Sequence, residues 1–492
     1  MTVHLMFPDR DFKSKEKPCF GQDDLAKDLE LDRILNEMSG KDRVIRESCT
    51  AALLHPLQSI REIQWRQENI RDALKNPNAV RELYDITVEA EERRKHSWCW
   101  LSPKNTVRRN FSDAVELLHL YTEMLARLRA VADREKAGFH AEGFLTLLNM
   151  LQKELSDEYL REIRAQLEEL KCGEGMLISF ELGPDLQSAG YVLRRKNQKG
   201  FKRRWKFAPS FTLPPRDDAG ARDLTAREER AVPEATGALA QSAEHLRSFF
   251  SHLRKELAFY VGSIRLAESL RARHLSICIP NLLEPASRDR GWQNLYDVAL
   301  ALTTKEAVTG NDIQAEKKNL YIITGANQGG KSTFLRSIGQ GQLMAQCGLF
   351  VGAESFTAPL RRGVYTHFTR AEDTSMKSGK LAEELERMDA IADHLGRDDL
   401  ILFNESFAST NEREGSEIGR GITEALTENG VEVFSVTHLY TFAASFIGRD
   451  GVEFLRAQRR EDGGRSYRIE RGRPLKTAFG EDLYQKIFKA DL

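Results

Sequence analysis

The pattern of hydrophobic and polar residues changes twice along the chain. From about Asp23 to Leu170, apolar residues recur every three or four positions, which is typical of amphipathic helices. Prolines interrupt the pattern, so it predicts a bundle of several helices with breaks near Pro56, Pro77 and Pro103. Within it, a long run of nearly heptad-spaced apolar residues from Phe144 to Leu170 predicts one extended helix packed against a partner.

After Gly173 the apolar period shortens to that of strands. Segments 176–182 and 191–193 predict two strands separated by turn residues. A segment that mixes basic and aromatic residues follows, and it could neutralise phosphates and lie against bases or sugars. Alternatively, it is a solvated hairpin whose aromatic residues pack underneath, and composition alone does not decide. The basic residues considered for nucleic-acid binding are Arg194, Arg195, Lys202, Arg203, Arg204 and Lys206, interleaved with Phe201, Trp205 and Phe207.

Helical periodicity returns in the second half of the chain. The polar stretch from Pro214 to Thr236 has no apolar period and predicts a loop or disordered linker. A second long helix is predicted around Leu246 to Ile264, so two long helices would form an antiparallel pair that carries the β-rich insertion at its tip. From about Asn281 strands alternate with helices, ending in a last helix near Glu481 to Phe488, which predicts an α/β domain.

Composition narrows the class of protein. The 492 residues suffice for about three domains, and 73 Lys plus Arg nearly balance 74 Asp plus Glu, so any nucleic-acid site must be a local patch. The six cysteines are scattered without a paired C-x-x-C, which argues against a zinc site or disulfide framework and favours a reducing compartment. The N-terminal residues lack a basic lead, and no apolar run approaches membrane-spanning length. We therefore expect a cytoplasmic protein with no membrane partner.

The clearest chemical signal is a phosphate-binding loop of the pattern G-x-x-x-x-G-K-[ST]. An apolar run, 320–323, precedes it, and a helical pattern follows, which is the context that the mechanism needs. Backbone N–H groups of the loop would cradle phosphates, Lys331 would reach the β- and γ-phosphates, and Ser332 would bind magnesium. The alternative is a glycine-rich turn with an incidental lysine. The predicted nucleotide-binding residues are Gly325, Asn327, Gly329, Gly330, Lys331, Ser332 and Thr333.

Two later strand ends supply candidates for the rest of an ATP site. The apolar run 400–403 ends in Asn404 and Glu405, where an Asp usually holds magnesium and a Glu polarises the attacking water. Asn404 brings no negative charge, so weaker magnesium binding and lower turnover are expected. Glu405 could instead be a solvated carboxylate. The strand 433–436 ends in Thr437 and His438, and spacing alone favours a structural role for this histidine over a γ-phosphate contact.

These residues resemble the ATPase domain of the MutS family of DNA mismatch-repair proteins. The resemblance rests on the loop 324–333, residues 344–354, the segment from Ser378 to Glu386, residues 404–410 and Thr437-His438. Upstream, Asn311-Asp312 and residues 57–74 also resemble the family. The resemblance implies an α/β P-loop ATPase of the ATP-binding-cassette type, joined to an all-α core and lever domain with a small β-rich clamp-like insertion.

The resemblance also implies a mechanism. Two ATPase domains would pair in a homodimer that binds ATP and Mg²⁺ and holds DNA by its structure rather than its sequence, and His438 would sense the γ-phosphate. The implied segments are the N-terminal segment 1–22, the helical core and first lever helix 23–170, the β-rich basic insertion and polar linker 171–236, the returning lever helix 237–285 and the ATPase domain 286–492.

The sequence departs from the family pattern at several points. Helical core sequence begins almost at once, so a mismatch-reading domain and specific mismatch recognition are not expected, and the clamp is reduced to about Tyr191 to Phe211. Val308 stands at the adenine-stacking aromatic position and Leu381 at the position of the trans-acting signature serine. Together with Asn404, these residues predict slow hydrolysis. No nuclease-like extension follows Phe488, so DNA cleavage is not predicted.

Three functions are consistent with these patterns. The first is a dimeric, ATP-regulated DNA-binding protein of DNA repair or recombination. The second is a nucleotide-gated protein-interaction switch without a DNA role, which Asn404 and Leu381 favour because a switch can work by binding alone. The third, a small-molecule kinase, is the weakest, because nothing supplies an acceptor pocket or lid.

Overall fold

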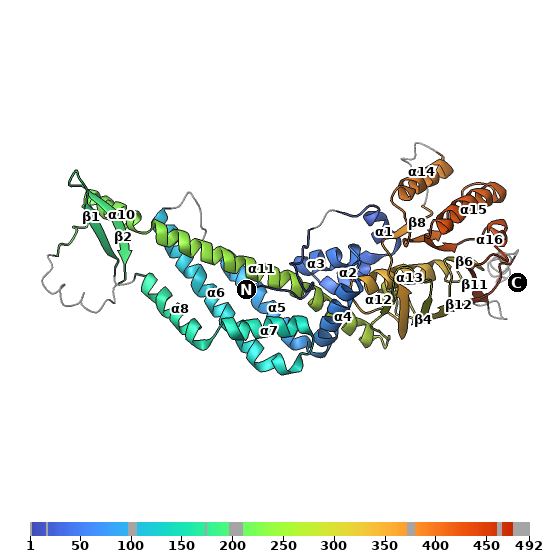
Figure 1. The fold of residues 1–492 in the computed structure, drawn as a ribbon, viewed down its shortest axis with the longest axis horizontal. Coiled ribbons are helices and arrows are strands. Elements are labelled where there is room, and N and C mark those ends of the chain that lie inside the picture. Colours follow the sequence, from blue (N-terminus) through green and yellow to red (C-terminus); the bar gives the residue numbers. More distant parts are fainter. Residues whose placement is uncertain are drawn as a thin grey trace, which may run out of the picture. The chain divides into compact units, whose positions relative to one another are not determined.

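A computed structural model describes residues 2–15, 18–96, 106–172, 175–195, 210–370, 379–459 and 465–475. The chain forms two compact units (Figure 1). The first comprises Met1–His4, Asn78–His140 and Phe144–Leu257, and the second comprises Leu5–Pro77, Ala141–Gly143 and Ala258–Leu492. Every helix in the described ranges falls short of the length and apolar character that a membrane crossing requires.

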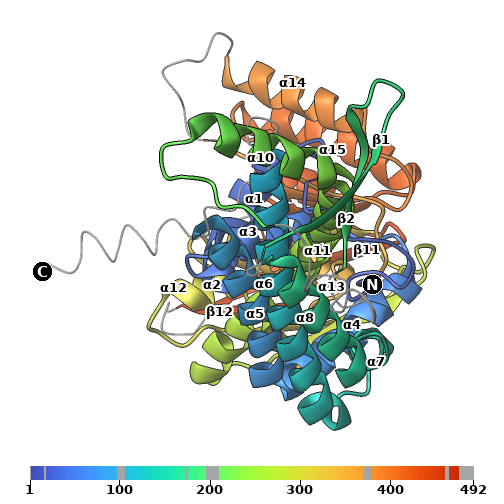
Figure 2. The same cartoon turned by 90° about the vertical axis from the view of Figure 1, so that its left-hand side faces the viewer.

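The first unit is a helical bundle with a β-hairpin. Its helices are α5 (Pro77–His96), α6 (Val107–Glu135), η1 (Lys136–Gly138), α7 (Glu142–Glu154), α8 (Asp157–Leu170), α10 (Asp218–Ala231) and the first part of α11 (Pro233–Ala272). Figure 2 shows α5, α6 and α8 side by side, and ion pairs such as Arg93–Glu123 join α5 to α6. The ring of Tyr121 on α6 stacks on Phe250 of α11 at 5.4 Å between centroids. The predicted helical bundle and the predicted helix around 246–264 are therefore confirmed.

The hairpin consists of β1 (Leu177–Leu182) and β2 (Ser188–Arg194), which pair antiparallel and confirm the two predicted strands. Helix α10 lies against β2. The clamp-like role of this insertion stays a prediction.

Two predicted features of this unit were wrong. The run 144–170 is two helices, because the chain breaks after Leu155, and the Ser156 side chain accepts a hydrogen bond from Tyr159 N and begins α8. The polar stretch 214–236 is largely the helix α10 rather than a loop. Asp217 caps this helix through Gly220 N, and i,i+4 pairs such as Arg227–Asp223 support it, so a helix forms without an apolar stripe.

The second unit contains two sheets. The six-stranded sheet has the order β12-β11-β6-β10-β9-β8, parallel except for the antiparallel pair β11–β12. The four-stranded sheet has the order β3-β7-β4-β5. The strands are β3 (Asn281–Leu283), β4 (Arg290–Leu295), β5 (Asn311–Ala315), β6 (Leu320–Thr324), β7 (Ser355–Pro359), β8 (Val364–Phe368), β9 (Leu400–Asn404), β10 (Glu432–Val436), β11 (Val452–Arg459) and β12 (Arg465–Arg471).

Helices surround these sheets. Helix α13 contacts β9 and β10 of the larger sheet and β3 and β4 of the smaller one, so it lies between the sheets, and α15 contacts β10. The helices are α1 (Gln22–Asp28), α2 (Leu31–Ser39), α3 (Arg43–Leu54), α4 (Ile60–Lys75), α12 (Val298–Thr303), α13 (Lys331–Gln346), α14 (Lys380–Ala392), α15 (Glu412–Glu428), α16 (Tyr440–Ala444) and the rest of α11. The α/β character predicted from about Asn281 is confirmed. The helix predicted near 481–488 lies outside the described residues.

The N-terminal residues from Leu5 onward are part of the core of this second unit. Leu5 and Met6 are fully buried, and the Leu5 carbonyl accepts hydrogen bonds from Trp65 Nε1 at 3.1 Å and Asn69 Nδ2 at 3.0 Å. Arg66 Nε donates to the Met6 carbonyl at 2.8 Å. The segment therefore anchors the helices that pack on the α/β domain.

Candidate nucleotide-binding site

The phosphate-binding loop connects the central strand β6 to α13. Every residue of β6 is buried, as expected for a strand with parallel neighbours on both sides. Gly325 and Gly330 have positive φ angles of 117° and 88°, and a side chain at Gly325 would meet Ala457 N at 2.9 Å. Gly330 caps the start of α13, so the N-terminal N–H groups of this helix are directed toward the loop.

Lys331 is the charged residue of the loop and is buried, with 5% of its surface exposed. Its Nζ donates to the carbonyls of Gly325 at 3.0 Å and Ala326 at 3.1 Å. Burial lowers the pKa of Lys331, and Glu405 opposes this effect. The ammonium group is thus held across the loop in which phosphates would bind.

Ser332 and Asn404 lie together, although 72 residues separate them in the chain. The Ser332 hydroxyl donates to Asn404 Oδ1 at 2.9 Å. Both side chains present oxygen atoms, which are the ligands that Mg²⁺ prefers. The pair therefore fits a magnesium site, although it lacks the negative charge that an aspartate would bring.

Glu405 and His438 come from the ends of neighbouring strands, β9 and β10. The carboxylate Oε2 lies 3.6 Å from His438 Nδ1, and the two side chains are 38% and 41% exposed. The contact with His438 lowers the pKa of Glu405, and the same contact raises the pKa of His438. A carboxylate kept ionised beside the loop can accept a proton or orient water.

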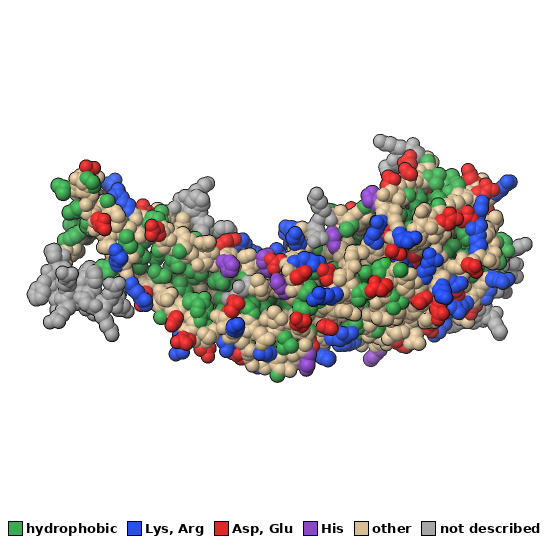
Figure 3. Space-filling model, in the orientation of Figure 1, with side chains coloured by type: hydrophobic (Ala, Val, Ile, Leu, Met, Phe, Trp, Pro, Cys, Tyr) green, Lys and Arg blue, Asp and Glu red, His purple; other side chains and the backbone are tan. Residues whose placement is uncertain are grey.

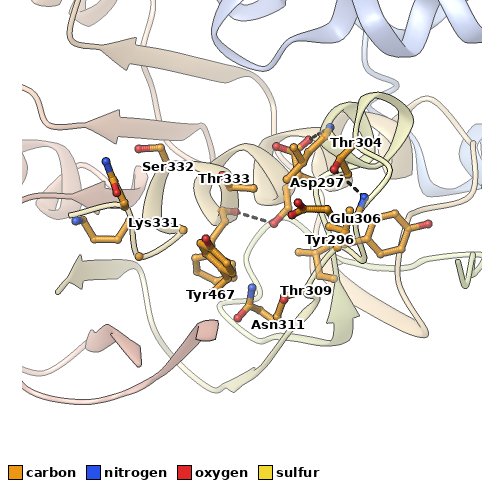
Figure 4. A pocket seen from close by; sticks show the side chains of 18 of the residues that line it. Tyr296, Asp297, Thr304, Glu306, Thr309, Asn311, Lys331, Ser332, Thr333 and Tyr467 are labelled. Atoms are coloured by element: carbon orange, nitrogen blue, oxygen red, sulfur yellow. Dashed lines mark hydrogen bonds between the residues drawn. The ribbon is translucent and has the colours of Figure 1, made fainter. Parts of the chain in front are cut away.

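A cavity of about 600 Å³ opens beside these residues and is shown in Figure 4. Its lining includes Val308, Thr309, Asn311, residues 327–334 and Glu405. Tyr467 of β12 also lines it, and the ring packs against Gly330. In Figure 4 the Tyr467 ring stands between Lys331 and Asn311. Asn311 Oδ1 accepts a hydrogen bond from Ile469 N at 2.7 Å, which holds β12 against this wall.

Sequence reasoning missed several residues of this cavity, among them Tyr296, Asp297 and Tyr467. Tyr467 belongs to one of the short late strands, which carries no motif. By contrast, the predicted residues of the loop lie together. The predicted residues that line the cavity are Asn327, Gly329, Gly330, Lys331, Ser332, Thr333 and Glu405. The other three contact lining residues: Gly325 contacts Lys331, Asn404 contacts Ser332, and His438 contacts Glu405. Leu381 lies in the first turn of α14 and does not line it.

The predicted DNA-binding residues belong to the first unit and are only partly described. Arg194 Nε donates to Ser179 Oγ at 2.8 Å, and Arg195 forms an ion pair with Glu169 at 2.8 Å, so the charge of Arg195 is partly balanced. Lys202, Arg203, Arg204 and Lys206 lie outside the described residues. On the face shown in Figure 3, basic side chains of the second unit alternate with acidic ones.

A phosphate loop between a buried parallel strand and a buried helix, with a carboxylate at the end of a nearby strand, defines a P-loop ATPase domain. Comparison with family models agrees with this class. The model of the MutS2 N-terminal domain matches residues 58–273, and that of MutS domain V matches residues 321–468. The chain belongs to the MutS family, which confirms the family predicted from the sequence.

Named relatives match parts of the chain. The endonuclease MutS2 of Geobacillus sp. (strain WCH70) is 28% identical over 226 residues, which are 46% of this chain and 27% of the relative. The endonuclease MutS2 of Thermus thermophilus is 32% identical over 148 residues, 30% of this chain and 20% of the relative. The DNA mismatch repair protein MutS of Thermus aquaticus is 32% identical over 154 residues, 31% of this chain and 19% of the relative. Each match therefore spans less than a third of the relative.

Proposed function

We propose that the chain is a MutS-like, ATP-dependent DNA-binding protein of DNA repair or recombination that acts as a nucleotide-gated homodimeric clamp. The observation that carries this proposal is the arrangement of Lys331, Ser332 and Glu405 around one cavity at the end of β6. A cytoplasmic location remains a prediction.

The loop residues would bind the triphosphate. Backbone N–H groups near Gly329 and Gly330 would donate to phosphate oxygens, and the Lys331 ammonium would exchange its two carbonyl partners for phosphate oxygens. The Tyr467 ring would pack against the base, because the half-buried Val308 offers no aromatic face there. The charges and the aromatic surface of the cavity are thus consistent with ATP.

Hydrolysis would depend on the strand ends. Ser332 and Asn404 would hold Mg²⁺, which supplies positive charge to the phosphate oxygens when bound. Glu405 would orient the attacking water, and His438, held by Glu405, would contact the γ-phosphate. Because Asn404 is neutral, we expect turnover to be slow.

The DNA-binding part of the proposal rests on the basic segment and on the relatives. Arg194, Arg195, Lys202, Arg203, Arg204 and Lys206 would neutralise backbone phosphates, which favours recognition of DNA structure over sequence. The relatives are named as an endonuclease and a mismatch repair protein, so a DNA substrate is the simplest expectation.

Nucleotide binding is tested by equilibrium titration with ATP. We expect Lys331→Ala to raise the Kd for ATP by about tenfold or more, since a charge-assisted contact is worth about 1.5–3 kcal/mol. Lys153→Ala, on the exposed surface of α7, is the matched control and should leave the Kd unchanged. Unchanged ATP binding in Lys331→Ala would refute the site. Turnover of the natural chain, compared with Asn404→Asp and Glu405→Ala, then tests hydrolysis, with a faster Asn404→Asp and an inactive Glu405→Ala expected.

DNA binding is tested through its salt dependence. The triple variant Arg203→Ala, Arg204→Ala, Lys206→Ala should bind more weakly, and the slope of log K against log salt should become shallower by about 0.9 for each phosphate that is no longer neutralised. Arg413→Ala on α15, where the side chain is 88% exposed, is the control. Equal slopes in the variant and the natural chain would remove the basic segment from the proposal.

A nucleotide-gated protein-interaction switch is the second candidate. The neutral pair Ser332–Asn404 favours it, because ATP can be bound there without the charge that supports rapid hydrolysis. This candidate predicts ATP-dependent dimerisation, measured by sedimentation, without retention of duplex, junction or single-stranded DNA at low salt.

A further inference from the structure

The turn that presents Glu405 has an unusual backbone. Glu405 and Phe407 have φ angles of 54° and 62°, a region that residues other than glycine seldom occupy and that is a genuine outlier for bulky side chains. Such a conformation persists only where the surrounding structure holds it. The contacts of this turn therefore decide where the Glu405 carboxylate lies.

The ends of two strands hold the peptide groups around Glu405. Its N–H donates to the Val436 carbonyl at 2.8 Å, and its carbonyl accepts a hydrogen bond from Thr369 Oγ1 at 2.6 Å. Thr369 N also donates to the Asn404 carbonyl at 3.1 Å. These contacts fix the turn at the side nearest to the sheet.

Glu384 of α14 holds the opposite side of the turn. This side chain is buried, with 5% of the residue exposed, and its Oε2 accepts hydrogen bonds from Phe407 N at 3.0 Å and Ser409 Oγ at 2.9 Å. The Phe407 carbonyl lies so close to Gly415 that a Cβ there would be 2.3 Å away. Both peptide groups of Phe407 are thus constrained, one by a carboxylate and the other by a glycine.

His367 of β8 forms a second connection between α14 and the turn. One ring nitrogen, Nε2, lies 3.0 Å from the Glu384 carbonyl, and Nδ1 lies 2.7 Å from Ser406 Oγ. Burial lowers the pKa of His367 to about 4, so the ring is neutral near pH 7. A carbonyl can only accept, so Nε2 carries the proton. The Ser406 hydroxyl donates to the His367 carbonyl at 2.6 Å, and its oxygen lies beside Nδ1. Glu384 thus contacts the turn directly through Phe407 N and indirectly through His367 and Ser406.

We propose that Glu384 is a positioning residue for hydrolysis, which holds the left-handed turn 405–407 so that the Glu405 carboxylate faces the phosphate loop. His367 supports the same turn through Ser406. This inference rests on the proposed function, because it assumes that Glu405 orients water beside bound ATP. It also links α14 mechanically to the catalytic carboxylate.

The test separates positioning from folding and from nucleotide binding. Glu384→Ala should lower kcat for ATP at least about tenfold, because displacements near 1 Å can cost about a hundredfold, while the Kd for ATP stays within about twofold. Glu384→Gln should restore kcat to within about threefold. Oε1 of Glu384 has no hydrogen-bond partner in the described ranges, so an amide NH₂ can take its place while the remaining oxygen keeps both donors. Glu386→Ala, exposed on the same helix, is the control.

A second variant covers the case in which Glu384→Ala does not fold. Ser406→Ala removes a hydroxyl but buries no unpaired charge, and it should lower kcat with an unchanged Kd for ATP. An unchanged kcat in Glu384→Ala or in Ser406→Ala, or a Glu384→Gln variant as impaired as Glu384→Ala, would overturn the inference.

Failure of this inference differs from failure of the proposed function. If the natural chain bound ATP without measurable turnover, the positioning role would be refuted, and the nucleotide-binding proposal would stand. If the natural chain bound no ATP, the proposed function itself would fail.

Discussion

Replacing Glu432 tests how the two sheets of the second unit are held together. Glu432 begins β10 of the larger sheet and is 1% exposed. Its carboxylate accepts from Arg290 Nε at 2.6 Å and from Arg361 Nε at 2.8 Å. Arg290 belongs to β4 of the smaller sheet, and Arg361 follows β7, so one buried carboxylate joins both sheets. Burial favours the neutral acid, but Arg290 and Arg361 together outweigh it and lower the pKa of Glu432.

The cost of removing this charge follows from the burial of its partners. Arg290 and Arg361 are 0% and 4% exposed, so Glu432→Gln would leave two guanidinium groups inside the protein, with only the longer contact from Arg361 to Asp398 at 3.9 Å to balance them. Breaking a buried pair in this way costs about 3–5 kcal/mol. Coulomb attraction between two opposite charges about 4 Å apart is worth about 4 kcal/mol at an effective dielectric constant near 20, which is similar to this cost. At about 2 °C for each kcal/mol, Tm should fall by about 6 °C or more.

The assay is thermal unfolding of the natural chain and three variants. Glu417→Gln removes a carboxylate from the pair Arg413–Glu417, whose side chains are 88% and 66% exposed, and should change stability by no more than about 0.5 kcal/mol. The triple variant Arg290→Met, Glu432→Leu, Arg361→Met should recover most of the stability, since apolar replacements of a whole buried network are often tolerated. If Glu432→Gln and Glu417→Gln shifted Tm equally, the reasoning would be refuted.

Two further predictions concern His367 and Tyr467. The pKa of His367 is about 4 in the folded chain and about 6.5 when exposed, so the neutral ring stabilises the fold fully above pH 6.5 and this stabilisation is lost as the pH falls. Urea unfolding should therefore show that the free energy of unfolding falls by about 1.4 kcal/mol between pH 7.5 and 5.5, and that His367→Gln removes this loss. An equal loss in the variant would contradict the assignment. Tyr467→Ala should raise the Kd for ATP by about fivefold or more, since base stacking is worth about 1–3 kcal/mol. Tyr467→Phe should bind ATP with the natural affinity in the same titration. Equal affinities in all three proteins would show that the ring is not part of the site.

The sequence predicted the central elements of the ATPase domain because their signals are local. The runs 320–323 and 400–403 are continuous apolar segments, and 433–436 is apolar apart from Ser435; they form the adjacent buried strands β6, β9 and β10. Parallel strands bring their carboxyl ends to one edge, so the loop, Asn404 and His438 could be expected near one another. Ser332 and Asn404, both proposed from the sequence for the metal site, do contact each other.

Residues joined across long stretches of chain could not be found in this way. Glu384 lies 23 residues before Phe407, and nothing in the helical pattern of α14 distinguishes its buried carboxylate from the exposed Glu386. Tyr467 reaches the cavity because β12 pairs with β11 and also lies beside β5, where Asn311 accepts a hydrogen bond from Ile469 N. The break at Ser156 was missed because buried apolar residues keep their helical spacing up to Leu155. The first helix nevertheless ends there, and the Ser156 side chain caps the start of a second helix.

Helix α13 shows why an apolar pattern understates burial. Its glutamines are fully buried, yet each finds partners on other elements: Gln340 Nε2 donates to the Leu29 carbonyl at 3.0 Å, and its Oε1 accepts from Val298 N at 2.8 Å. Six residues further on, Gln346 donates to the Arg361 carbonyl at 2.7 Å. A glutamine amide both donates and accepts, so it can satisfy backbone groups that an apolar side chain would leave unpaired. The helix that begins at the phosphate loop is therefore fixed along its length by specific polar contacts, and a displacement of its first turn by nucleotide would have to be accommodated at the residues that hold these glutamines.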